Sequence, residues 1–230
     1  MTPRERPIIF NGPMIRAILD GSKTQTRRIV KWPAWMQPHP EVFASDLRDG
    51  YGVWYVPEGE WTSKEFRCPY GKPCDRLWVR EAWMPDPPID DTWASTQWAG
   101  CREGKIAGVP ERFRHPRYCN YAANWLHGEV LWTPSIHMPR WASRITLEIV
   151  SVRVERLQDI SEADAIAEGV ESNVDDGVTY YGPYGKGHCD PRVAYAWLWE
   201  SINGEGSWIP NPWVWVISFA RVGDTKPEES

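Results

Sequence analysis

"SRITLEIVSVRVERL", residues 143–157, carries the clearest β-strand pattern in the chain. Apolar residues occupy alternate positions in its first half and shift by one position in its second half: Ile145, Leu147 and Ile149, then Val150, Val152 and Val154. Because strand side chains alternate between two faces, this shift moves the apolar set to the other face. We therefore predict one long strand with a bulge or sharp bend, as at a barrel corner.

Two helices are predicted after this strand. In "DISEADAIAEGV" (159–170), Ser161 is the expected N-cap, apolar residues follow at helical spacing, and Gly169 ends the helix. A Gly- and Tyr-rich loop is expected at 175–190. Asp190 and Pro191 then begin a second helix, whose predicted apolar face carries Ala194, Trp197, Leu198 and Ile202.

The remaining elements are mostly strands. "RPIIF" (6–10), "RLWVREAW" (76–83) and "WVWVISF" (213–219) have strand composition, and the last is apolar on both faces, which indicates burial on two sides. Pro13 begins a short helix that ends at Gly21. Strands separated by isolated helices, with one bent strand, predict an α+β domain built on a curled sheet.

Composition limits the possible functions. The 230 residues suffice for one large domain or two small ones, and the net charge of -5 means that nucleic-acid contact would require a local basic patch. The 16 tryptophans can fill a core, line a pocket or stack on bases. The segment "MTPRERPIIF" lacks an apolar signal core, and no run reaches membrane-spanning length, so we expect a cytoplasmic protein without membrane contact.

The five cysteines are odd in number and irregularly spaced, which favours a reducing compartment over a disulfide framework. Cys68 and Cys74 are separated more widely than the cysteines of a zinc knuckle, with His188 and Cys189 as a possible second half of a site. Free thiols in loops are the simpler interpretation. We expect neither a metal nor a cofactor.

Hydroxyls and cations crowd into "GSKTQTRRIV", residues 21–30, directly after the first predicted helix. We expect a loop here, whose side chains project into a cleft. Lys23 and Thr26 have the types of a base and a nucleophile in acyl transfer. A phosphate clamp and an ordinary solvated loop fit the same residues.

Glu168 lies in the last turn of its predicted helix, where the helix dipole disfavours an acid by roughly 0.3–1 kcal/mol. Either the glutamate is exposed and the cost is tolerated, or a cation compensates it. Lys23 and Arg28 are the candidate partners.

A second cationic segment, "ERFRHPRY" at 111–118, interleaves arginines with aromatic residues. This mixture is compatible with nucleic-acid binding, and it is also common on solvated surfaces. The sequence contains no Walker loop, GxGxxG, HExxH or GxSxG pattern. NTPase, dinucleotide-enzyme, zincin and common hydrolase-elbow functions therefore have no support.

Four motifs in order carry a family resemblance: "IIFNGPMIRAILDGSKTQTRR", "YGKPCDRLWVRE", the long strand followed by "RLQDISEADAIAEGV", and "LWESINGEGSWIPNPWVWVISF". The chain resembles ASCH-domain proteins, particularly the large variety encoded by bacteriophages and prophages. The resemblance implies a PUA-like fold, a small mixed β-barrel with flanking helices, in a superfamily that mostly binds RNA or modified bases. It implies a single domain over 1–230 with insertions at about 31–65, 84–130 and 171–190.

Small bacterial members of this family are N4-acetylcytidine amidohydrolases with a K-x-x-T pattern after the first helix. The resemblance therefore assigns catalysis to Lys23, Thr26 and Glu168, and we expect Thr24, Arg27 and Arg28 to bind substrate. Arg27 replaces an aliphatic residue of the small enzymes. The expected ligand is a modified nucleoside or nucleic acid, in a cleft between 21–28 and the end of the 161–168 helix, roofed by the Trp-rich insertions.

Thr26 is the expected nucleophile, and two roles remain open for Lys23. A neutral Lys23 would be the base, whereas a glutamate within about 4 Å would keep it charged as an oxyanion stabiliser and leave Glu168 as base or proton relay. The rival functions are a non-catalytic reader of RNA or modified DNA, with Lys23, Arg27 and Arg28 on phosphate, and a ribonuclease.

Overall fold

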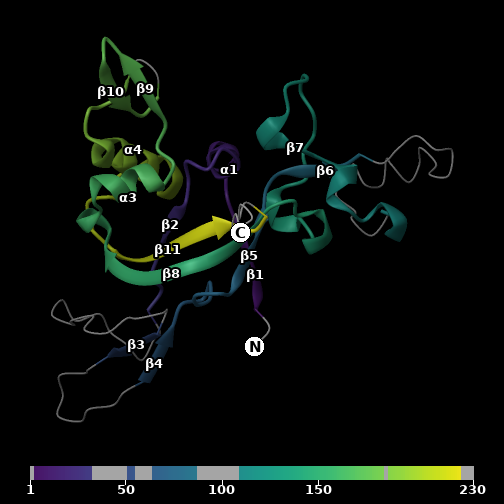
Figure 1. Cartoon of the computed structure of the whole chain (residues 1–230), viewed down its shortest axis with the longest axis horizontal. Coiled ribbons are helices and arrows are strands. Elements are labelled where there is room, and N and C mark those ends of the chain that lie inside the picture. The colour runs from purple at the N-terminus through teal and green to yellow at the C-terminus, as the bar shows by residue number, and fades with distance from the viewer. Residues whose placement is uncertain (1–2, 33–50, 55–63, 87–108, 184–185, 224–230) are drawn as a thin grey trace, which may run out of the picture. The chain divides into compact units, whose positions relative to one another are not determined.

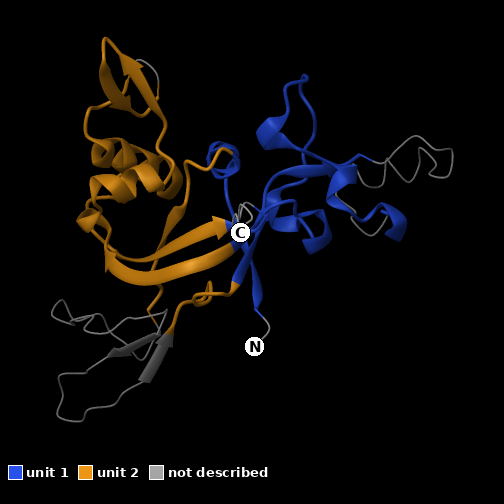
Figure 2. Ribbon diagram, in the orientation of Figure 1, with its two compact units in different colours: residues 1–19, 76–147, 221–230 blue, residues 20–75, 148–220 orange. Residues whose placement is uncertain are grey.

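The computed structural model describes residues 3–32, 51–54, 64–86, 109–183 and 186–223. The chain falls into two compact units, each built from separate stretches of sequence: residues 1–19, 76–147 and 221–230 in the first, and 20–75 and 148–220 in the second (Figure 2). Most of the predicted insertion at 31–65, and residues 87–108 of the one at 84–130, lie outside the described residues. The boundaries of a single domain with insertions stay a prediction.

The first unit combines short strands with one helix and several 3-10 turns. Its regular elements are β1 (Glu5–Ile9), α1 (Gly12–Leu19), β5 (Arg76–Arg80), β6 (Trp83–Pro85) and β7 (Cys119–Tyr121) (Figure 1). β1 pairs with β5 in parallel, and β6 pairs with β7 antiparallel. The predicted strands at 6–10 and 76–83 and the helix from Pro13 are thus confirmed to within a few residues.

The second unit contains most of the described α-helical residues and the two longest strands. Its elements are β2 (Gln25–Ile29), β3 (Tyr51–Trp54), β4 (Lys64–Arg67), β8 (Thr146–Arg156), α3 (Glu162–Ala167), β9 (Ser172–Asp175), β10 (Val178–Tyr181), α4 (Pro191–Asn203) and β11 (Trp213–Arg221). β8 begins and β11 ends in residues assigned to the first unit. Within the second unit, α3 and α4 lie side by side, and β10 lies against α4 (Figure 1).

The largest sheet has the strand order β1-β5-β8-β11-β2. Over the described part of the chain this sheet is open, with β1 and β2 as its edge strands. The structure therefore shows a mixed α+β protein, as the sequence predicts, and shows no closed barrel among these residues.

β8 contains the predicted change of face. Leu147 and Ile149 are buried, Val150 and Ser151 are both exposed, and Val152 is buried again. Two successive exposed residues are the expected sign of a one-residue slip. β8 and β11 are drawn as curved ribbons (Figure 1), which agrees with the predicted bend.

Three local predictions were wrong. Residues 25–29 are not a loop but strand β2, paired antiparallel with β11, and its first three residues are buried. The segment after Glu171 is not only a loop but contains the β9–β10 hairpin. The buried face of α4 includes Tyr195 and Trp199, whereas Trp197 and Ile202 are exposed.

The β9–β10 hairpin has a two-residue turn at Asp176 and Gly177, both with positive φ, at 47° and 78°. This is the backbone of a type I′ turn, for which Asp-Gly is a favoured pair. A Cβ on Gly177 would meet nothing within 4 Å, so only the backbone opposes substitution.

We expect Gly177→Ala to lower stability by about 1–2 kcal/mol, because a left-handed conformation is costly for residues with a Cβ. Gly177→Asn is the matched control and should cost less, since asparagine tolerates this conformation. Thermal unfolding of both variants measures the difference. Equal stability of the alanine variant and the wild type would show that this turn is not formed.

The core of the second unit lies between α3, α4 and one face of β11. Its buried residues are Leu157, Ile160, Ala165, Val170, Ala194, Tyr195, Trp199, Val214 and Val216. β11 has four consecutive buried residues, Val214–Ile217, so its predicted burial on both faces is confirmed. Among the described residues, no helix has the length and apolar character needed to cross a membrane.

Candidate functional site

The candidate site lies where β2 meets the end of α3. α3 begins as predicted, with the Ser161 Oγ accepting a hydrogen bond from the Asp164 amide. It ends at Ala167, with Glu168 as the C-cap before Gly169, whose φ is 80°. The Thr24 amide donates to the Ala167 carbonyl at 2.9 Å. The two segments expected to flank a cleft are therefore hydrogen-bonded directly to each other at this point.

Lys23 and Glu168 form a buried ion pair across 145 positions of sequence. The Lys23 Nζ lies 2.8 Å from the Glu168 Oε2, with side-chain exposures of 0% and 2%. The same nitrogen donates to the backbone carbonyls of Gln25, at 2.8 Å, and Glu168, at 2.7 Å. Three acceptors on one nitrogen match the three N–H groups of an ammonium, so this geometry favours charged Lys23.

Arg27 holds the other oxygen of Glu168. Its Nη1 donates to the Glu168 Oε1 at 3.1 Å, while its Nε and Nη2 donate to Glu155 and its Nη2 also donates to Asp164. The Arg27 side chain is 0% exposed, and its guanidinium lies over the Tyr195 ring. Glu168 is thus fixed between two buried cations, which supply the compensation that its position at the helix end requires.

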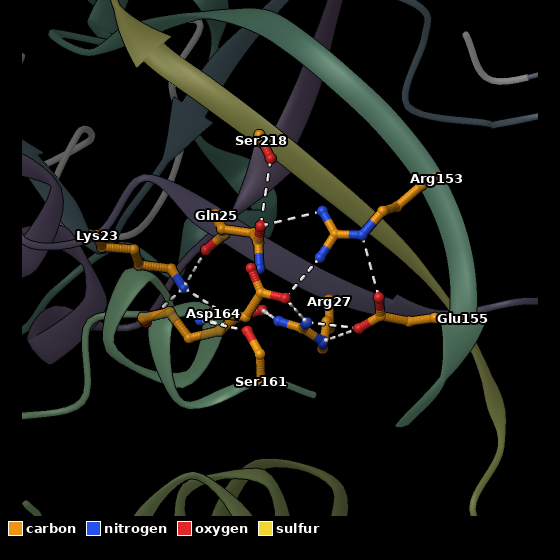
Figure 3. A network of polar contacts seen from close by, with 9 residues as sticks. Lys23, Gln25, Arg27, Arg153, Glu155, Ser161, Asp164 and Ser218 are labelled. Atoms are coloured by element: carbon orange, nitrogen blue, oxygen red, sulfur yellow. Dashed lines mark hydrogen bonds and ion pairs between the residues drawn. The ribbon is translucent and has the colours of Figure 1, made fainter. Parts of the chain in front are cut away.

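Arg153 completes a closed cycle of charges (Figure 3). Its Nε donates to Glu155 at 3.0 Å and its Nη2 donates to Asp164 at 2.7 Å. Both carboxylates also bind Arg27, so two guanidiniums and two carboxylates alternate around the cycle. We call these six residues the charge cluster: Lys23, Arg27, Arg153, Glu155, Asp164 and Glu168.

The charge cluster is buried at one end and open at the other. Lys23 and Arg27 have no exposed side-chain surface, whereas the exposed fraction is 17% for Glu155, 25% for Asp164 and 38% for Arg153. Three cations and three carboxylates balance, so the cluster carries no net charge when all are ionised. A ligand would therefore approach it from the side of Arg153 and Asp164.

Burial and charge move the pKa values in the cluster. Burial lowers the pKa of Lys23 below its ordinary value, and the adjacent Glu168 opposes this without cancelling it. Burial alone would lower the pKa of Arg27, but the charges of Glu168 and Glu155 raise it above its ordinary value. Burial alone would raise the pKa of Asp164, but the charge of Arg153, the hydrogen bond from the Gln25 side chain and the charge of Arg27 together lower it.

The structure brings Lys23, Arg27 and Glu168 together, and the hydrogen bonds and ion pairs given above do not involve the side chains of Thr24, Thr26 or Arg28. Alternation along β2 turns Thr26 and Arg28 to the face opposite Gln25 and Arg27. Thr26 is buried and lies opposite Ile217 in the register, and the contacts that form the cluster do not include its hydroxyl. Arg28 is half-buried opposite Trp215, and Thr24 is exposed.

Four residues of the network were not singled out from the sequence as site residues: Gln25, Arg153, Glu155 and Asp164. The Gln25 Oε1 accepts hydrogen bonds from Arg153 and Ser218. The available signal was the group of charges in "RVER" at the end of a strand with several buried apolar residues. Buried strands seldom carry such charges without partners.

The structure gives less support to the other sites considered from the sequence, namely the cysteines and the cationic segment 111–118. Within the described residues, no group of three or more His, Cys, Asp or Glu side chains could hold a metal ion. Cys68, Cys74, Cys119 and Cys189 form no disulfide there. In the cationic segment 111–118, Arg112 stacks on Phe113 and Arg117 on Tyr118.

Comparisons with protein-family models, with curated proteins and with solved structures found no match to this chain.

Proposed function

We propose that this protein is an amidohydrolase that removes an acyl group from the exocyclic amine of a cytosine-type nucleoside, with N4-acetylcytidine as the model substrate. The observation that carries this proposal is the buried 2.8 Å pair of Lys23 and Glu168. The ASCH resemblance assigns these two residues to catalysis from separate motifs. A PUA-like fold, with the barrel that it implies, is part of the same proposal.

Burial of the cations supports the enzyme over the nucleic-acid reader. A reader would use Lys23 and Arg27 to hold phosphates, which requires side chains that reach solvent. Both side chains are 0% exposed and are bonded to carboxylates. Phosphate would have to displace those carboxylates from their cations.

In the proposed reaction the Thr26 oxygen bonds to the acyl carbon, the bond from that carbon to the exocyclic nitrogen breaks, and the nitrogen takes a proton. Water then hydrolyses the resulting ester, which yields a carboxylic acid and the free nucleoside. Glu168 relays the protons, and the Lys23 charge stabilises the oxyanion. Because three protein acceptors occupy the Lys23 Nζ, an acyl oxygen that binds it directly must replace one of them.

The position of Lys23 connects it to Thr26. β2 is an edge strand, and the Gln25 carbonyl that accepts from Lys23 belongs to the peptide bond joining Gln25 to Thr26. The ammonium therefore lies beside the backbone of Thr26, although the Thr26 side chain faces away from Arg27. Lys23 and Thr26 are 2% and 1% exposed, so a substrate reaches either group only when this edge of the sheet opens.

We expect Thr26→Ala to reduce turnover of N4-acetylcytidine at least about 100-fold, as for loss of a nucleophile or acid–base group. Thr26→Ser keeps the hydroxyl and should retain most of the activity. Chromatographic measurement of cytidine released over time tests both. Near-normal turnover by Thr26→Ala would mean that the nucleophile is not the threonine but a water molecule activated by Glu168.

The pH dependence distinguishes the two roles of Lys23. If charged Lys23 stabilises the oxyanion, kcat should fall on the alkaline side with an apparent pKa below 10.5, because burial lowers the Lys23 pKa from that value. If neutral Lys23 is the base, kcat should rise over the same range. The geometry predicts the fall. Rates need correction for spontaneous alkaline hydrolysis of the substrate.

A further inference from the structure

Arg153 is the most exposed cation of the charge cluster. Its side chain is 38% exposed, whereas those of Lys23 and Arg27 are buried completely. It projects from β8 at the end of the cluster where a ligand can approach. The catalytic assignment gives it no role.

The Arg153 guanidinium is held through all three of its nitrogens. Nε donates to Glu155, Nη1 donates to Gln25 at 3.3 Å, and Nη2 donates to Asp164 (Figure 3). These partners are held in turn, the two carboxylates by Arg27 and the Gln25 amide by Ser218. Three bonds in the plane of the guanidinium fix the orientation of that plane before any ligand binds.

This arrangement selects for a flat, uncharged ligand. The edge of the guanidinium is bonded to protein acceptors, so the flat face is the surface that it can offer, and nucleobases stack on such faces. A phosphate would meet the carboxylates of Glu155 and Asp164 beside the cation and be repelled. Charge therefore favours a base over a phosphate here.

Gln25 lies beside this surface and is 4% exposed. Its Oε1 accepts from Arg153, and its side chain also hydrogen-bonds to Asp164, which helps to lower the pKa of that carboxyl. Gln25 therefore helps to hold Arg153 and its carboxylate partner in place. The geometry points to Arg153 as the stacking surface for the base of the substrate. This assignment rests on the proposed function for the identity of the base.

Equilibrium dialysis with two nucleosides tests the stacking. Cytidine has an aromatic ring, whereas freshly prepared 5,6-dihydrocytidine is puckered and keeps the same carbonyl. We expect the wild type to bind cytidine at least about 10-fold more tightly, since stacking on a planar side chain is worth about 1–3 kcal/mol per base. Arg153→Lys keeps the charge and loses the plane, so the preference should fall below about 3-fold.

The control is Arg192→Lys, an arginine with 49% exposure that is also held by a carboxylate, Asp190, and should leave the preference unchanged. In the hydrolysis assay, Arg153→Lys should raise KM about 10-fold with little change in kcat. No preference in the wild type, or an unchanged preference in Arg153→Lys, would overturn the stacking assignment even if N4-acetylcytidine is hydrolysed. Stacking that depends on Arg153 without any hydrolysis would overturn the proposed function and leave this assignment standing.

Discussion

Replacing Glu168 with glutamine is expected to slow N4-acetylcytidine hydrolysis at least about 100-fold, the scale of a lost acid–base group. Glutamine has the same shape but a single acceptor oxygen, so it can keep the hydrogen bond from Lys23, at 2.8 Å in the wild type, or from Arg27, at 3.1 Å, and turns its NH2 toward the other cation. The loss of the carboxylate should appear in kcat, measured at a temperature at which the variant is still folded. Steady-state kinetics with circular dichroism measures both.

Glu162→Gln is the matched control, because Glu162 lies on the same helix with 65% of its side chain exposed and should be dispensable for turnover. Lys23→Met should give a similar loss, and Lys23→Met with Glu168→Gln should be little worse than either change alone, since paired groups act as a unit. A Glu168→Gln enzyme within about 10-fold of the wild type would remove the glutamate from the mechanism.

Replacing Arg27 with methionine is expected to cost about 3–5 kcal/mol of unfolding free energy, because it leaves carboxylates buried without one of their cations. Glu168 would keep only Lys23, and Glu155 and Asp164 would keep only Arg153. Urea unfolding with a fitted m-value measures the change.

Arg192→Met is the control for Arg27, since Arg192 is exposed and its ion pair is open to solvent. It should not change the unfolding midpoint measurably. If Arg27→Met also left the midpoint unchanged, the buried cycle of charges would not exist in solution. A cost of this size would give Arg27 a structural role toward Glu168, whereas the sequence suggested that it binds substrate.

Local signals predicted much of the fold. The apolar shift in 143–157 gave the bend of β8, and the Ser161 cap with Gly169 gave the limits of α3, because these features depend on neighbouring residues alone. β2 was missed because its polar residues, such as Gln25 and Arg27, are buried only through partners far away in sequence. The β9–β10 turn carried the Asp-Gly signal at Asp176 and Gly177, and its loop-like surroundings concealed it.

The site was predictable in part. The unfavourable place of Glu168 at a helix end indicated a missing cation, and the family resemblance pointed to Lys23. Arg153 and Asp164 could not be found this way, because their meeting with Gln25 depends on how β8, β2 and α3 come together. Such long-range placement leaves no spacing pattern in the sequence.

The most direct test of the central claim, hydrolysis at the pair of Lys23 and Glu168, is the release of acetate from free N4-acetylcytidine by the wild type and by Lys23→Met. The assay is run between about 50 and 200 mM salt beside a titration of oligonucleotide binding. The account predicts equal amounts of acetate and cytidine from the wild type, a loss of at least about 100-fold in Lys23→Met, and little effect of salt. Oligonucleotide binding that weakens steeply with salt, with no acetate released by the wild type, would contradict it.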